Sequence, residues 1–312
     1  MADAEQRQSL HPTLWPVDED AREKIESVVR VGVEGADPSV RELWLLAEAS
    51  GRTVGMTHTM MVPVPPIYEA LSGPPGLILD DCFTTDDAPS GTAQTLLAAT
   101  EAALRDAGAK LLLASCLAGG QWRSIFERHG YEPVTLYMGK VGFEIADLPT
   151  SVRPAGADDV PGIVAASAEH RKILSQLNAQ FWNIHPDANA RFDRWMRRSL
   201  TLADREMFVS DAPDEVQGYI IAQPVSSLLI PAAHDINAIG VIDDYYDKDF
   251  ANPSAAVSAE STAAELLSTA EGAFARRNVE AALVVCPAAW RSKISVLERR
   301  GYRTAKLWML KS

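Results

Sequence analysis

Two pairs of adjacent acidic residues are the first candidates for chemistry in this chain. Asp80 and Asp81 end one run of β-forming residues, and Asp243 and Asp244 end a second run. Successive side chains of a strand point to opposite faces, so at most one member of each pair can face a given site. A carboxylate placed in this way can act as a general base, or it can cap or bridge neighbouring loops.

A histidine and a cysteine lie in the same part of the chain. His58 alternates with Thr57 and Thr59, so we expect its side chain on one face of a strand, either in a cleft or as an ordinary surface or core residue. Cys82 follows Asp81, but no His or Lys that would activate its thiol is identifiable. We interpret Cys82 as a packing residue, and we expect no metal site.

The elements that position these residues occur twice. The second copy repeats the first in constant order with small changes of spacing, of 163, then 170, then 171 positions. The matched pairs include Gly55 with Gly218, Asp80 with Asp243, Cys116 with Cys286, and Tyr131 with Tyr302. The sequence therefore predicts two domains, 1–148 and 152–312, separated by a segment rich in proline and small polar residues.

Within each copy the hydrophobic periodicity alternates between strands and helices. In the first copy, β-forming runs at 42–47, 53–62 and 77–83 precede an amphipathic helix that contains Leu96 and Leu97. An apolar run at 111–114 then indicates a strand buried on both faces, paired in parallel across that helix. A second helix ends at Gly130, and a last strand follows.

Composition restricts the class of protein. The 312 residues are 47% hydrophobic and 23% charged, which is typical of a globular protein. The net charge of −13 disfavours nucleic-acid binding and favours cationic partners. The amino terminus has no cationic start followed by an apolar run, and the three cysteines suit a reducing compartment, so we expect a cytoplasmic protein that does not contact the membrane.

This order of elements resembles the GNAT superfamily of N-acyltransferases, and the resemblance covers nearly the whole chain twice. It implies two tandem GNAT-type α/β domains, each with a mixed, mostly antiparallel central sheet flanked by helices. It also implies acetyl-CoA or another acyl-CoA as co-substrate, with no metal. In that family, backbone amides at the start of the central helix bind the pyrophosphate of the donor.

The first copy is the better match to this donor loop. Gly91 and Ala93 keep the small residues of the family pattern, whereas Ser261 replaces the glycine in the second copy and Glu260 adds a negative charge. The resemblance assigns donor binding in the first copy to six residues, namely Cys82, Phe83, Ser90, Gly91, Thr92 and Ala93. A loop that merely caps a helix is the alternative for both copies.

The resemblance also suggests catalytic and acceptor residues. Asp81 is the first candidate base, and His58 is a second candidate catalytic residue. The tyrosine that often protonates the departing thiolate is replaced by Phe126 and Leu297. For the acceptor, the family builds its pocket from the region of the first helix, which nominates His170, Trp182 and Trp195 in the second copy, unless these are ordinary core residues.

Three hypotheses on function follow. The first is an N-acyltransferase, most simply an N-acetyltransferase of a small-molecule amine, with one domain degenerate. The second changes the donor to a carrier-protein thioester or an aminoacyl-tRNA, and the basic stripe of Arg191, Arg194 and Arg198 would suit either partner, or be a solvated helix face. The third is a protein that binds or sequesters a ligand without catalysis.

Overall fold

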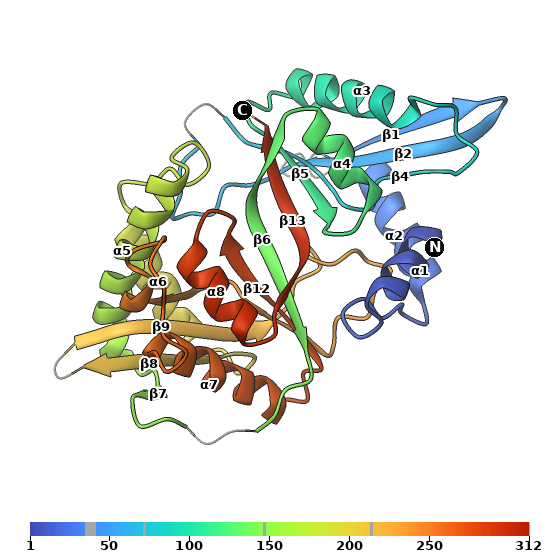
Figure 1. Cartoon of the computed structure of the whole chain (residues 1–312). Coiled ribbons are helices and arrows are strands. Elements are labelled where there is room, and N and C mark those ends of the chain that lie inside the picture. Colours follow the sequence, from blue (N-terminus) through green and yellow to red (C-terminus); the bar gives the residue numbers. More distant parts are fainter. Residues whose placement is uncertain (35–41, 71–72, 146–147, 213–214, 312) are drawn as a thin grey trace.

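A computed structural model describes residues 1–34, 42–70, 73–145, 148–212 and 215–311. Ala146 and Asp147, in the predicted boundary between the copies, lie outside this description. Thirteen strands of the described chain form one continuous mixed sheet, and helices cover both of its faces (Figure 1). The predicted combination of a mixed sheet with flanking helices is therefore confirmed.

The first copy starts with two helices and then alternates strands and helices. Its elements are α1 (Ala2–Leu10), α2 (Ala21–Glu34), β1 (Glu42–Ala49), β2 (Arg52–Met61), β3 (Gly76–Ile78), β4 (Phe83–Thr84), α3 (Thr92–Asp106), β5 (Leu112–Leu117), α4 (Gln121–Arg128) and β6 (Tyr131–Val141). The run expected as one strand at 77–83 is interrupted, because the segment that carries Asp80 and Asp81 leaves the ladder between β3 and β4.

The second copy repeats this order after an additional strand and a longer helix. Its elements are β7 (Val152–Pro154), η1 (Ala157–Asp159), α5 (Val160–Leu177), α6 (Ala188–Ser199), β8 (Glu206–Ala212), β9 (Glu215–Pro224), β10 (Ile239–Ile242), β11 (Tyr245–Asp247), η2 (Lys248–Phe250), α7 (Thr262–Arg276), β12 (Ala281–Pro287), α8 (Arg291–Arg299) and β13 (Arg303–Lys311).

Each copy contains one parallel pair of strands in an otherwise antiparallel sheet. β3 pairs in parallel with β5 across α3, and β10 pairs in parallel with β12 across α7. The parallel pairing predicted for the first copy, and implied by the repeat for the second, is therefore confirmed. In each pair the first strand ends earlier. Asp80, two residues after β3, and Asp243, directly after β10, lie where the two strands part.

The two copies exchange their last strands at the centre of the sheet. β13 of the second copy lies between β5 and β6 of the first, and β6 in turn pairs with β12 of the second (Figure 1). The exchange carries apolar side chains across: Leu307 and Met309 of β13 are buried in the core under α3 and α4. Val134 and Met138 of β6 are buried in the core of the second copy. Each core is thus completed by the other copy.

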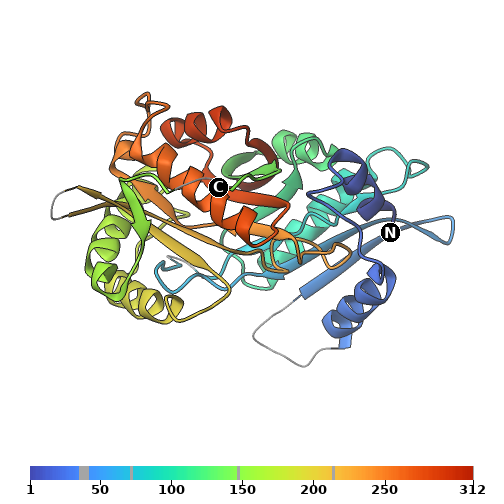
Figure 2. The same cartoon turned by 90° about the horizontal axis from the view of Figure 1, so that it is seen from below.

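The helices form layers on both sides of this sheet. α3 packs on β1 and β2, and its counterpart α7 packs on β8 and β9. Figure 2 shows α5 and α6 on the opposite side of β8 and β9 from α7. None of the described helices combines the length and the hydropathy that a bilayer span requires.

The exchanged strands should make the two copies unfold together. We expect one coincident transition in guanidinium chloride by tryptophan fluorescence and by far-ultraviolet circular dichroism. Met309→Ala should lower the free energy of unfolding of the whole chain by about 2–4 kcal/mol, because it empties a buried site that the other copy supplies. The exposed Leu46→Ala, on β1, should cost less than about 0.5 kcal/mol. Two separate transitions would contradict this expectation.

Candidate functional site

The start of α3 in the first copy is open to an anion. Gly91 precedes the helix in the left-handed conformation, with φ of 89°, and no side chain of the described residues caps the helix. The amide and the hydroxyl of Thr92 donate only to the carbonyl of Pro89 in the preceding turn. Ser90 and Gly91 are exposed. Amides at a helix N-terminus, together with the helix dipole, favour a negative charge at this point. The predicted donor loop therefore has the geometry of an anion site.

The equivalent start of α7 in the second copy is already filled by the protein. The amide of Ala263 donates to Asp249 at 3.2 Å, and Ala264 donates to Ser261 at 3.2 Å. The hydroxyl of Thr262 also donates to Asp249, at 3.0 Å. Asp249 lies in the stretch between Asp244 and α7 that contains the seven-residue insertion, and it places a carboxylate where a phosphate would bind. A second anion at this helix start would meet a like charge.

The side chains beside the helix start also differ between the two copies. In the second copy, Tyr245 and Trp290 lie between β11 and α8 with no exposed surface, and Phe250 packs between them. Register pairing with β2 and β9 places Cys82 at the position of Tyr245, and Gly120 precedes α4 as Trp290 precedes α8. Small residues occupy these positions in the first copy, whereas aromatic rings occupy them in the second.

The two predicted catalytic residues of the first copy lie next to each other. Nδ1 of His58 is 2.9 Å from Oδ2 of Asp81, and Nε2 of His58 is 3.5 Å from Oε2 of Glu42. The His58 ring is 95% buried and stacks on Trp44, with ring centroids 3.5 Å apart. Four buried polar atoms of this group have no hydrogen-bond partner among the described residues: Glu42 Oε2, Trp44 Nε1, His58 Nε2 and Asp81 Oδ1. The cluster thus offers unused hydrogen-bonding capacity beside Cys82.

Sequence reasoning missed Glu42 and Trp44. Trp44 is directly opposite His58 in the β1–β2 ladder, and Glu42 lies two residues earlier on the same face of β1. A prediction of the β1–β2 hairpin register would have found both residues.

Asp80, in contrast, has a structural role. Its carboxylate accepts from Nη1 of Arg7 at 2.8 Å and lies 3.1 Å from Nζ of Lys306. Burial opposes ionisation, but Lys306 and Arg7 outweigh it and hold the pKa of Asp80 well below its usual value. This ion-pair cluster joins α1, the end of β3 and β13.

The predicted donor-side thiol is inert. Cys82 is buried and donates to the carbonyl of Leu79 at 3.1 Å. Burial, followed by the nearby Asp81, raises its pKa well above the ordinary range. Phe83 pairs with Met56 in the ladder of β4 and β2. Among the residues that the structure describes, no group of acids, histidines and cysteines could hold a metal ion.

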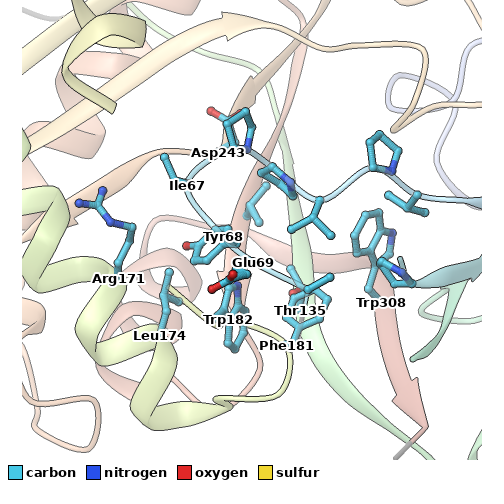
Figure 3. A pocket seen from close by; sticks show the side chains of 18 of the residues that line it. Ile67, Tyr68, Glu69, Thr135, Arg171, Leu174, Phe181, Trp182, Asp243 and Trp308 are labelled. Atoms are coloured by element: carbon cyan, nitrogen blue, oxygen red, sulfur yellow. The ribbon is translucent and has the colours of Figure 1, made fainter. Parts of the chain in front are cut away.

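A cavity in the second copy brings together all three predicted acceptor residues. His170 of α5, Trp182 after it and Trp195 of α6 line a space of about 560 Å³. Figure 3 shows Trp182 in this cavity. The central strands form its floor, and the parting of β10 and β12 opens into it beside Asp243 and Asp244. The sequence did not indicate the other wall, which is the segment 62–70 of the first copy.

That wall is attached to the second copy by backbone hydrogen bonds. Glu69 donates to Asn183, and His185 donates to Ile67. Arg191, the first residue of the predicted basic stripe, donates to the carbonyl of Pro66 at 2.9 Å. The first arginine of the basic stripe therefore makes a structural contact between the copies.

The corresponding space in the first copy is closed. Leu14 and Trp15 match Phe181 and Trp182 at a spacing of 167, and they are buried together with Ile230 from the second copy. The isolated bridge of Val17 with His234 repeats the bridge of Tyr68 with Ile184. Each copy thus covers the other, and of these two corresponding spaces the one in the second copy is open. The sequence signal that could have revealed this correspondence is the apolar residue followed by tryptophan at 14–15 and again at 181–182.

Comparison with known proteins identifies the fold. No model of a known protein family matches the chain, and no curated protein matches it. Among solved structures, a GCN5-related N-acetyltransferase from Sphaerobacter thermophilus is 16% identical, with 92% of this chain and 84% of that chain covered and a TM-score of 0.55. A tandem GNAT protein from the clavulanic acid biosynthesis pathway is 12% identical, with 94% of each chain covered and a TM-score of 0.46.

The likeness to the Sphaerobacter protein shows that this chain has the fold of the GNAT N-acetyltransferases. The predicted fold class, two tandem units of this type, agrees with the strand order and with the two equivalent parallel pairs.

Asp244 gives a stability prediction. Burial first, and then Asp243, raise its pKa to about 7. Tyr219, Tyr68, Arg171 and Lys293 also face this carboxylate. An acid with a raised pKa costs the folded state free energy once it ionises, so the cost grows between about pH 4 and pH 7 and persists above.

Asp244→Asn removes this cost. We expect the variant to gain on the order of 1–3 kcal/mol in free energy of unfolding at pH 8 and almost nothing at pH 4, measured by urea denaturation at both pH values. Asp204→Asn, at an exposed surface pair with Arg205, is the matched control and should show no comparable gain at pH 8. An equal effect of Asp244→Asn at both pH values would contradict the expectation.

Proposed function

We propose that this protein is an acyl-CoA-dependent N-acyltransferase whose first copy binds the donor, most simply acetyl-CoA, and whose acceptor is a small-molecule amine. The observation that carries the proposal is the uncapped start of α3 with the small residues Cys82 and Gly120 nearby, in contrast to the second copy, where Asp249 and aromatic side chains take the equivalent positions. The GNAT fold supports a donor pyrophosphate at the Gly91 loop. The second copy is then degenerate as a donor site.

The Glu42–His58–Asp81 cluster has the composition needed to receive an amine. A protonated amine would be attracted by the two carboxylates, and Oδ1 of Asp81 is free to accept a proton while Oδ2 is held by His58. The neutral amine would attack the thioester carbonyl, and collapse of the tetrahedral intermediate would form the amide and release the CoA thiolate. Phe126 stands where the family often has a tyrosine, so water would protonate that thiolate.

The donor site can be tested by isothermal titration of the protein with acetyl-CoA. We expect micromolar affinity, and a loss of at least 100-fold in Gly91→Glu, because the carboxylate would repel the phosphates and the left-handed backbone disfavours a side chain. Ser90→Glu adds the same charge at an exposed neighbour without that backbone strain, and it should also weaken binding.

Ser261→Glu, at the equivalent helix start of the second copy, is the matched control and should leave the affinity unchanged. Loss of affinity in Ser261→Glu with retention in Gly91→Glu would move the donor to the second copy. Absence of binding in the native chain would turn attention to a carrier-protein or tRNA donor, or to a non-catalytic role.

The acceptor cluster can be tested by measuring thiol release from acetyl-CoA with a panel of small primary amines. Asp81→Asn should lower kcat by about 10²–10⁴, because the proton acceptor is lost, while the dissociation constant of acetyl-CoA stays the same. His58→Gln keeps a hydrogen-bond donor and should cost less. Undiminished turnover in Asp81→Asn at all pH values would remove this residue from the mechanism.

A further inference from the structure

The cavity of the second copy is large enough for an organic ligand and has no donor site of its own. Its volume of about 560 Å³ falls in the range of small-molecule sites. Asp249 occupies the helix start that would hold a phosphate, and Tyr245 and Trp290 are the side chains beside it. A molecule in this cavity would therefore be bound without an acyl donor beside it.

Two carboxylates at one end of the cavity form no direct ion pair with any described residue. Asp243 accepts from Gln223 at 2.8 Å, and Asp244 accepts from the hydroxyl of Tyr219 at 3.1 Å. Neither forms an ion pair with any residue in the described ranges, whereas their counterpart Asp80 has two cations. Asp243 also keeps exposed surface although it lines the cavity. A ligand can therefore reach a carboxylate that lacks an ion-pair partner.

Aromatic rings surround the rest of the space. Figure 3 shows Tyr68 and Trp182 on either side of Glu69, with Trp308 further along the floor. Aromatic faces attract organic cations, and the attraction is larger where water is excluded. The walls thus favour a positively charged ligand, as the two carboxylates do. They also offer apolar surface for the body of that ligand.

His170 supplies a second, independent indication of a ligand. It is 94% buried and lines the cavity, yet its ring nitrogens make no hydrogen bond to any residue that the structure describes. Burial, followed by Lys293 and Arg171, lowers its pKa well below the ordinary value, so the ring is neutral. A buried imidazole without a hydrogen-bond partner retains hydrogen-bonding capacity that a bound molecule can satisfy.

The two buried cations of the wall are held by hydrogen bonds within the protein, although Nε of Arg171 has no hydrogen-bond partner among the described residues. Arg171 donates to Ser167 and Asn189 and lies over the ring of Phe192. Lys293 donates to the carbonyl of Tyr245 at 2.8 Å and lies 5.0 Å from the centre of its ring. Both side chains are almost completely buried, at 2% and 1% exposure, whereas Asp243 is open. An anion would find less accessible charge here than a cation.

We propose that this cavity is a second ligand site, which binds an organic cation with a bulky apolar or aromatic body. The cationic group lies against Asp243 and Asp244, the body lies between the aromatic walls, and His170 hydrogen-bonds to a polar group of the ligand. The segment 62–70 of the first copy closes over the bound molecule. The site is independent of the acyl-donor site proposed above.

Fluorescence titration with three dansyl probes of one aromatic body tests the proposal. Dansylcholine carries a quaternary ammonium that cannot be acylated, dansylamide is neutral, and dansylglycine is anionic. We expect dansylcholine to bind at least 10-fold more tightly than either of the others. Asp243→Asn with Asp244→Asn should remove that preference, and Trp182→Ala should weaken all three probes. Gly91→Glu should leave the affinity for dansylcholine unchanged.

Each other outcome overturns the proposal. Tighter binding of dansylglycine would assign the cavity to an anion, and equal binding of the three probes would leave the carboxylates without a role. Loss of dansylcholine in Gly91→Glu would place the probe in the donor site, and no binding of any probe would remove the site. If acetyl-CoA fails to bind while dansylcholine binds as expected, only the proposed transferase function falls.

Discussion

The exchange of β6 and β13 fixes almost every other relation in this molecule. Because β13 pairs with β5 and β6 pairs with β12, the two copies share one sheet and cannot rotate relative to each other without breaking its central ladders. This fixed orientation brings the segment 62–70 of the first copy over α5 and α6, and it brings Ile230 of the second copy onto Leu14 and Trp15. A cavity built from both copies is possible only in this arrangement.

Within that common frame the two copies have diverged by filling different spaces. The first copy keeps small residues, Cys82 and Gly120, where the second has Tyr245 and Trp290. On the other side of the sheet the relation is reversed: Trp15 and its neighbours close the space that remains open around Trp182. One copy therefore keeps an uncapped helix start, and the other keeps an open cavity.

The two copies also differ in how their equivalent acidic residues are paired. Arg7 and Lys306 neutralise Asp80 in the first copy. At the repeat spacings, Leu174 corresponds to Arg7 and Thr135 to Lys306, and neither carries a charge. The second-copy acids therefore have no ion pair, and burial raises the pKa of both. These two differences remove the ion-pair partners that the first-copy acid has.

The sequence by itself determined the duplication, the order of strands and helices, and the GNAT fold, because these depend on local periodicity and on glycines such as Gly91 whose left-handed conformation few other residues adopt. It also nominated His58 with Asp81, and His170 with Trp182 and Trp195, each set from short-range pattern. Only the tertiary structure decided which strand pairs with which, because β6 and β13 have equivalent sequences and either could complete either core. The partners Glu42, Arg7 and the segment 62–70 depend on that long-range pairing, which no local pattern records.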